Sequence, residues 1–231
     1  MKKHIFSVYP LKKREIVLWF LSVSVIIITN LILQSDDYMS LAASLIGVTS
    51  LIYLAKGFAI GQILIIIFAL FYGWISFDNK YYGEMITYLC MTTPMALFSL
   101  VQWIRNPYKD TNEVKVRVKI NRKHYFILIT SCTAVALSFY FILKALGNAS
   151  LMVSTISIAT SYVAAYLTAI RSPYYAIWYA LNDAVLIVLW IIASFENSEN
   201  IQIVANFTVF LANDMYGFIS WKKMEQRQNK K

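Results

Sequence analysis

The sequence predicts an all-α integral membrane protein of about eight transmembrane helices. Of its 231 residues, 59% are hydrophobic and only 14% are charged, whereas a soluble domain averages roughly 45–50% apolar and 25% charged residues. The apolar residues form eight segments, at 16–34, 38–55, 57–77, 81–104, 125–146, 150–170, 174–195 and 200–221. Each is about as long as a helix that crosses the hydrocarbon core of a bilayer.

The first segment follows basic residues, as in a signal peptide. Its apolar run, Ile16–Leu33, is long enough to span, and no small-residue cleavage site follows it before Gln34. We therefore expect an extra N-terminal helix at 16–34 that is retained.

The basic residues indicate how the segments are oriented. If both termini are cytoplasmic, 19 of the 21 Lys and Arg residues lie inside and only Lys80 and Lys144 lie outside, as the positive-inside rule requires. We therefore expect a multi-pass protein of the cell inner (plasma) membrane with cytoplasmic termini. Orientation accounts for the net charge of +9, so no nucleic-acid partner is needed.

An internal repeat organises the segments. Trp103 ends the first triplet and Trp221 ends the second, a shift of 118 residues, while Lys56 and Arg171 precede the third and seventh segments, a shift of 115. This predicts two parallel three-helix bundles, at 38–104 and 150–221, joined by a cytoplasmic loop at 105–124 and a linker helix at 125–146. Parallel repeats are a transporter architecture with the substrate near the midplane; chance similarity among Trp-ended helices is the alternative.

Two Asn-Asp pairs mark a candidate site. Asn182 lies eight residues from the start of the seventh segment, and Asn213 lies eight residues from the end of the eighth. At 1.5 Å per residue, both are about 12 Å from the cytoplasmic helix ends. We expect both amides to line one cavity and contact one ligand. The alternative is that the pairs only bond helices together, at about 0.6 kcal/mol each.

Aromatic and polar side chains accompany these pairs and suit a flat, polar organic molecule. Glu84 near the outer surface is expected to be an ordinary solvated carboxylate, and Pro94 is expected to bend its helix, with Thr92 and Thr93 bonding the freed backbone groups. The substrate-binding candidates are Trp178, Asn182, Asp183, Asn213, Asp214, Trp221, Gln62, Tyr72 and Tyr88.

Enzymatic, metal and channel functions find little support. The sequence contains no GxSxG, HExxH or Cys/His pair, and only two histidines. We expect no catalytic residue, no bound metal and no cofactor. No selectivity filter or charged ring suggests an ion channel.

Several strings resemble the PnuC nicotinamide riboside transporters over about residues 15 to 226. They are Lys56-Gly57 with Gly61-Gln62, Tyr81–Tyr88, Trp103–Tyr108, Glu113–Val116, Arg171–Tyr175, Asn182-Asp183 and Asn213–Phe218. The resemblance implies facilitated diffusion of nicotinamide riboside without ion or ATP coupling, for cytoplasmic NAD synthesis. It also implies a full-length relative of the SWEET fold and a homotrimer.

The resemblance extends to single residues. Trp178, Asn182, Asn213 and Trp221 match family positions in the second bundle, whereas Leu100 replaces the first Trp of a Trp-x-x-Trp pair that many relatives carry before Trp103. Because related transporters of thiamine and riboflavin share the fold, another vitamin is the alternative substrate. A ligand-sensing membrane receptor is the alternative from another class.

Overall fold

The predicted apolar segments fold as helices over most of their length. The computed structural model describes residues 11–33, 38–78, 82–117, 119–148, 150–195 and 201–230, and this part of the chain contains helices and no strand. The helices are α1 (Lys13–Ile32), α2 (Tyr38–Ala55), α3 (Ile60–Asp78), α4 (Tyr82–Ile86), α5 (Thr93–Arg105), α6 (Arg122–Ala145), α7 (Leu151–Ala169), α8 (Tyr175–Ser194) and α9 (Ile201–Asn229). A π-helical stretch, η1 (Thr87–Thr92), joins α4 to α5.

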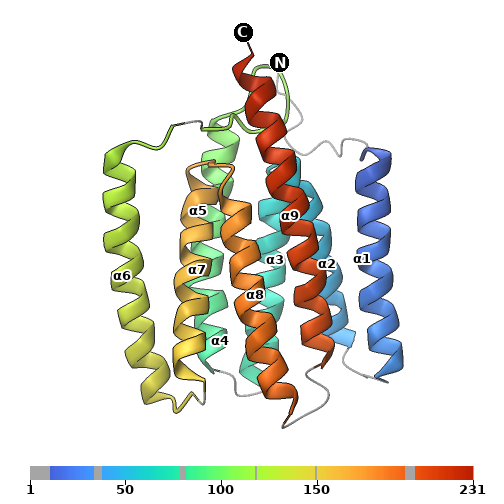
Figure 1. The fold of residues 1–231 in the computed structure, drawn as a ribbon, viewed down its shortest axis with the longest axis vertical. Coiled ribbons are helices and arrows are strands. Elements are labelled where there is room, and N and C mark those ends of the chain that lie inside the picture. The colour runs from blue at the N-terminus through green and yellow to red at the C-terminus, as the bar shows by residue number, and fades with distance from the viewer. Residues whose placement is uncertain are drawn as a thin grey trace.

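Among the described residues, seven helices are long and apolar enough to cross a membrane. They are α1, α2, α3, the continuous helix that contains α5 (Gly83–Arg105), α6, α7 and α8. The chain is therefore a multi-pass membrane protein, as expected. α9 runs beside these helices (Figure 1) but is not among the seven, because polar residues such as Asn206, Asn213 and Asp214 interrupt its apolar sequence.

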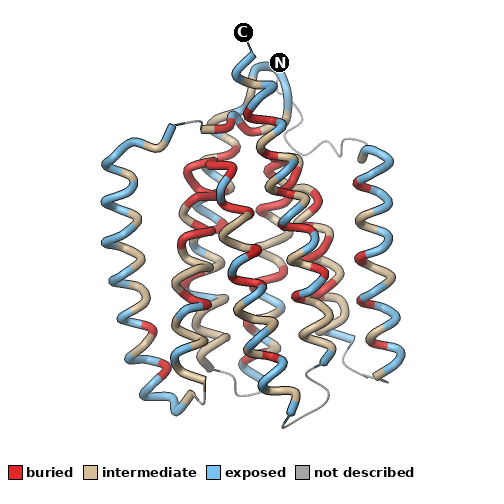
Figure 2. Tube along the Cα trace, viewed as in Figure 1, coloured by how far each residue is buried: buried red, intermediate tan, exposed pale blue. Residues whose placement is uncertain are grey.

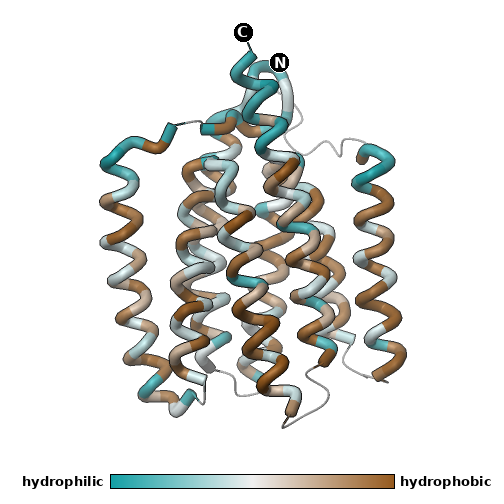
Figure 3. The backbone as a smooth tube through the Cα atoms, viewed as in Figure 1, coloured by the Kyte–Doolittle hydropathy of each residue, from teal (hydrophilic) through white to brown (hydrophobic). Residues whose placement is uncertain are grey.

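Two helices stand at the edges of the bundle (Figure 1): α1, which packs against α2 and α9, and α6, which packs against α7. Between them, α2 contacts α3 and α3 contacts α5, while α7 contacts α8 and α8 contacts α9. The pairs α2–α9 and α5–α7 connect these two groups. Exposed positions dominate α1 and α6 in Figure 2, and apolar ones prevail along them in Figure 3, as expected of lipid-facing helices.

The hydrophobic core is concentrated at one end of the bundle, where α9 extends past the other helices (Figure 2). Trp221 and Trp103 are 0% and 2% exposed there, and Tyr175 packs with them. Arg117, Arg171 and Arg227 also lie at this end, which we call the basic end.

The loop between α5 and α6 is part of this core. Val114 and Val116 are buried in the same cluster as the two tryptophans, and Gln228 of α9 bonds to the loop backbone on both sides, accepting from Val116 N and donating to Val114 O. Glu113 pairs with Arg227. Residues 105–124 therefore do more than join the two bundles: the buried valines show that they also close the basic end.

The two tryptophans make reciprocal hydrogen bonds. Trp103 of α5 donates its Nε1–H to Thr168 O of α7 at 2.9 Å, and Trp221 of α9 donates to Leu54 O of α2 at 2.8 Å. Their ring centroids lie 5.3 Å apart. Each tryptophan thus caps the end of a helix from the other half of the chain.

The helices that receive these bonds end in the same way. Gly57 (φ 69°) follows α2, with Gly57 N bonded to Leu54 O and Phe58 N to Tyr53 O. Arg171 (φ 63°) follows α7, with Arg171 N bonded to Thr168 O and Ser172 N to Leu167 O. Both are Schellman motifs, in which a left-handed residue, usually glycine, ends the helix.

Candidate substrate site

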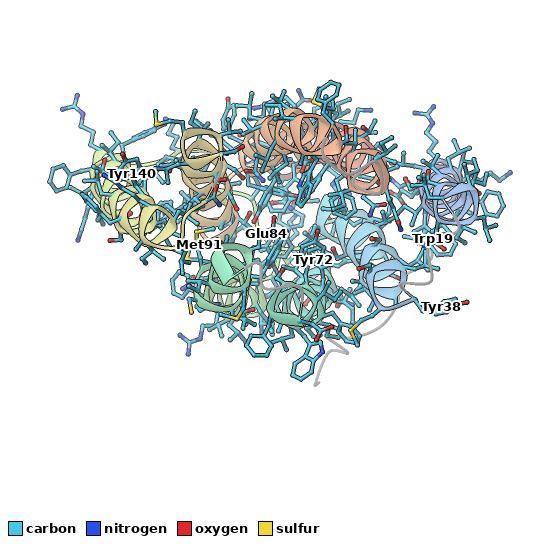
Figure 4. All side chains as sticks on the ribbon, turned by 90° about the horizontal axis from the view of Figure 1, so that it is seen from below. Trp19, Tyr38, Tyr72, Glu84, Met91 and Tyr140 are labelled. Atoms are coloured by element: carbon cyan, nitrogen blue, oxygen red, sulfur yellow. The ribbon has the colours of Figure 1, made fainter. Side chains whose placement is uncertain are left out.

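A cavity of about 410 Å³ lies between α3, the α4–η1 stretch, α7, α8 and the start of α9. Its rim includes Gly83, Glu84 and Asn148, so it reaches the end of the bundle opposite to the basic end. Figure 4, seen from that end, shows Glu84 and Tyr72 between the helices. The volume is within the range of about 300–1,000 Å³ that is usual for small-molecule sites.

Asn182 is a buried polar residue in the cavity wall. Its Oδ1 accepts hydrogen bonds from Ser157 Oγ at 2.9 Å and from Thr160 Oγ1 at 3.0 Å, both on α7. Its Nδ2 has no bond to any described residue and is therefore the group that remains to donate to a ligand. Two α7 hydroxyls thus fix the carboxamide before any ligand arrives.

Aromatic side chains form another part of the wall. The rings of Tyr72 on α3 and Tyr88 on η1 have centroids 4.7 Å apart, and Phe68 meets the edge of Tyr88 at 5.8 Å. Trp190 of α8 and Phe207 of α9 also line the cavity. The site can therefore hold a flat ring against aromatic faces and bond its polar groups to Asn182 and the serines of α7.

The π-helix next to the cavity has a cause in the sequence. Pro94 stands in the first turn of α5 and has no backbone N–H to donate to the preceding turn. Thr93 Oγ1 donates to Tyr88 O at 2.9 Å, and Thr87 Oγ1 donates to Gly83 O. Tyr88 O also accepts the backbone N–H of Thr93, so it is not the carbonyl that Pro94 frees, and the expected re-bonding of that carbonyl by Thr92 or Thr93 stays a prediction. π-Helical segments of this kind are often found at functional sites.

The two aspartates lie together. Asp183 and Asp214 are each 5% exposed, and their carboxyl groups are neighbours on α8 and α9. Asp183 Oδ2, Asn213 Oδ1 and Gln62 Nε2 are buried without a partner among the described residues. Unpaired buried polar atoms are costly, so this region, like the cavity, has hydrogen-bonding capacity that the protein leaves unused.

The structure separates the two asparagines that we expected in one cavity. Asn213 is 1% exposed and does not line the cavity; its Nδ2 donates to Ser22 Oγ of α1 and to Val209 O, both at 2.8 Å. The shared-cavity expectation is wrong for this structure, because the α9 face that carries Asn213 packs against α1. Whether Asn213 contacts substrate stays a prediction.

The remaining candidates divide in the same way. Tyr72, Tyr88 and Asn182 line the cavity, while Trp178, Trp221, Gln62 and the two aspartates do not. Trp178 is partly buried against the core cluster at the basic end, to which Trp221 belongs.

Among the cavity residues that were absent from the candidates are Glu84, Asn148 and Trp190. Glu84 is partly buried and lines the cavity, so it faces the space that a ligand would occupy; that it is an ordinary solvated carboxylate stays a prediction. A carboxylate beside a transmembrane aromatic run was the available signal. Asn148 follows α6, and its Oδ1 accepts from Ser150 N and Ser154 Oγ.

A multi-pass helical protein that encloses a polar, aromatic cavity between its helices belongs to the class of small-molecule membrane transporters. The sequence also identifies the family within this class. The chain belongs to the nicotinamide mononucleotide transporter family, whose family model matches residues 37–223.

Similar proteins cover almost the whole chain. The nicotinamide riboside transporter PnuC of Neisseria mucosa is 24% identical over 235 residues, covering 99% of this chain and 87% of that protein. PnuC of Haemophilus influenzae is 24% identical over 196 residues, covering 84% and 83%. A crystal structure described as the vitamin B3 transporter PnuC superposes with a TM-score of 0.80 at 20% identity over 95% of each chain. The fold is therefore that of PnuC.

Proposed function

We propose that this protein takes up nicotinamide riboside across the membrane. The observation that carries the proposal is the 410 Å³ cavity, in which Tyr72, Tyr88 and Trp190 accompany the amide of Asn182. Nicotinamide riboside has a flat pyridinium ring, a carboxamide and ribosyl hydroxyls. The ring matches the aromatic side chains of the cavity, and the carboxamide and hydroxyls match the amide of Asn182. The two relatives are named nicotinamide riboside transporters, and the family is named for nicotinamide mononucleotide, the phosphate ester of the same nucleoside; the relatives support nicotinamide riboside itself.

Calorimetric titration of the purified protein with nicotinamide riboside, thiamine and riboflavin tests this assignment. We expect saturable binding of nicotinamide riboside and much weaker binding of the other two. Tight binding of riboflavin or thiamine with none of nicotinamide riboside would contradict it. Uptake of labelled substrate into liposomes separates a transporter from a receptor that only binds.

We propose that transport is facilitated diffusion. The proposal rests on the resemblance to the PnuC family, because the neighbouring carboxyl groups of Asp183 and Asp214 in the middle of the described helices could themselves bind a proton. Labelled nicotinamide riboside should equilibrate across liposomes, and an imposed proton or sodium gradient should leave the plateau unchanged. Accumulation above equilibrium that a protonophore abolishes would show proton coupling instead.

We also propose that α9 crosses the membrane as an eighth helix and that α2–α5 and α7–α9 form two three-helix bundles in a SWEET-like arrangement, joined by α6. The reciprocal bonds of Trp103 and Trp221 and the matching ends at Gly57 and Arg171 support this repeat. Both termini are then cytoplasmic in the inner membrane. Cysteine labelling from the outside of intact cells, and from the inner side of the membrane in inverted vesicles, tests this topology.

The oligomer and the full set of substrate contacts rest on the resemblance to the PnuC family. We propose a homotrimer, for which light scattering of the purified protein should give three chains per particle. Trp178, Asp183, Asn213, Asp214, Trp221 and Gln62 remain candidate substrate contacts, in a state whose cavity reaches further toward the basic end than the present one.

A further inference from the structure

Arg171 has an unusual environment at the basic end. Its side chain is buried, with the whole residue 9% exposed, and two guanidinium nitrogens, Nε and Nη1, are buried without a hydrogen-bond partner in the described part of the chain. A buried charge is normally paired or fully hydrogen-bonded. The described residues do not provide such pairing for Arg171.

The backbone of Arg171 is also unfavourable for an arginine. Its φ of 63° is in the left-handed region, which residues other than glycine avoid. The corresponding residue of the first half is Gly57, which has φ 69° and the same Schellman hydrogen bonds. A glycine at position 171 would fit the turn without strain, so the arginine side chain needs another reason to be there.

The two halves of the chain also differ in whether an acidic residue pairs with the basic residue at this helix end. Lys56, which precedes Gly57, forms an ion pair with Glu15 at 2.8 Å. No described carboxylate pairs with Arg171. Its close charged neighbour is instead a second arginine, Arg117, whose backbone N–H donates to Arg171 O at 2.9 Å.

Arg117 is only half buried, and its Nη1 donates to Nε2 of His124 at 2.5 Å, which uses one of its donors but does not balance its charge. Burial and the positive charge of Arg117 both lower the pKa of Arg171. Arg117 and Arg171 therefore carry two neighbouring positive charges with no acidic partner among the described residues.

We propose that Arg171 and Arg117 form a binding site for a phosphate group at the basic end of the molecule. A phosphate monoester carries about −1.5 to −2 charges at neutral pH and can match two guanidinium groups, unlike a single carboxylate. The planar donor fork of arginine suits phosphate oxygens in geometry as well as charge. A soluble phosphate ester and a phospholipid headgroup share this chemistry. The site is separate from the substrate cavity and does not depend on the transported substrate.

Thermal unfolding of three full-length proteins tests the proposal: the wild type, Arg171→Gly, and Arg105→Gln as the matched control. Arg105 is an exposed arginine at the same end of the bundle. Each is placed in phosphatidylcholine nanodiscs with inorganic phosphate, with ribose 5-phosphate, or with chloride at equal ionic strength. A further arm replaces part of the phosphatidylcholine with phosphatidylglycerol.

We expect phosphate at a hundredfold excess over its Kd to raise Tm of the wild type and Arg105→Gln by about 5 °C. Arg171→Gly should show no such rise and should unfold at a higher temperature than the wild type in chloride, because the glycine relieves both the strain and the unpaired charge. A response to the soluble phosphates identifies a soluble ester as the ligand; a response only to phosphatidylglycerol identifies a headgroup.

The proposal is overturned if the wild type responds to neither source, or if Arg171→Gly responds as strongly as the wild type. Should Arg171→Gly fail to fold, Arg117→Gln decides, because Arg117 lies nearer to solvent. Its response to phosphate should fall, and an undiminished response overturns the proposal.

Discussion

Replacing Asn182 by leucine removes the amide from the cavity wall while keeping a side chain of similar size. Ser157 Oγ loses its acceptor, whereas the single O–H of Thr160 can donate to Ile156 O or Ser157 O instead. The ligand loses the free Nδ2 donor and meets an unpaired hydroxyl instead. Leaving a buried polar group unpaired costs about 1–3 kcal/mol, so the Kd for nicotinamide riboside should rise by about 5- to 150-fold.

Asn213→Leu is the matched control, because it makes the same chemical change on α9. The bond that it removes joins α9 to Ser22 of α1, outside the cavity. If the cavity of this structure is the whole binding site, we expect a lower Tm, since α1 is partly detached, and a change in Kd of less than about threefold.

Calorimetry in detergent measures both Kd values, and thermal unfolding confirms that each variant is folded. The double variant completes a mutant cycle. If both single changes weaken binding about tenfold and their effects are not additive, the two asparagines contact one ligand. In that case the sequence-based hypothesis stands, and our reasoning from the cavity in this structure is refuted.

Substitutions at three further positions test other parts of the site. Glu84→Gln should weaken nicotinamide riboside about three- to tenfold through lost attraction to the pyridinium charge and leave a neutral isostere unaffected; equal effects on both ligands would remove the charge argument. Trp178→Ala should lose more affinity than Trp178→Phe if Trp178 stacks on the cation, worth about 0.5–2 kcal/mol, and neither should matter if it only packs in the core. Trp221→Phe leaves Leu54 O without its tryptophan donor and should lower stability by about 1–3 kcal/mol, as unfolding would measure; loss of binding at unchanged Tm would make it a substrate contact.

Helix positions followed from the sequence because the local signal is strong. Runs such as Ile16–Leu33 are apolar throughout, and their length matches a bilayer. The central loop was harder to interpret: Val114 and Val116 alternate with charged residues in a way that also fits an exposed strand. Only the packing of α9 and the Trp103–Trp221 pair over them shows that these two valines are buried.

The site was predictable only in part, for a geometric reason. Periodicity indicates that Asn182 and Asn213 each lie at a certain depth on one face of a helix, but it does not indicate which neighbour covers that face. α8 turns Asn182 to the hydroxyls of α7, whereas α9 turns Asn213 to Ser22. On the face of α1 that meets this surface, Glu15, Trp19 and Ser22 bond to Lys56 just after α2, to α2 and to α9. Because α1 is apolar in overall composition, the sequence alone did not reveal this polar stripe.

The two ends of the bundle differ in a way that bears on transport. The cavity reaches the end formed by Glu84 and Asn148, which we predict to be outside. At the basic end, the paired rings of Trp103 and Trp221 and the buried valines of the loop fill the space between the helices. We infer that the structure is a state closed at the basic end. Release of a ligand there requires the tryptophan hydrogen bonds to Leu54 O and Thr168 O to separate or shift. Because each of these bonds joins one half of the chain to the other, a relative movement of the two halves would break both at once.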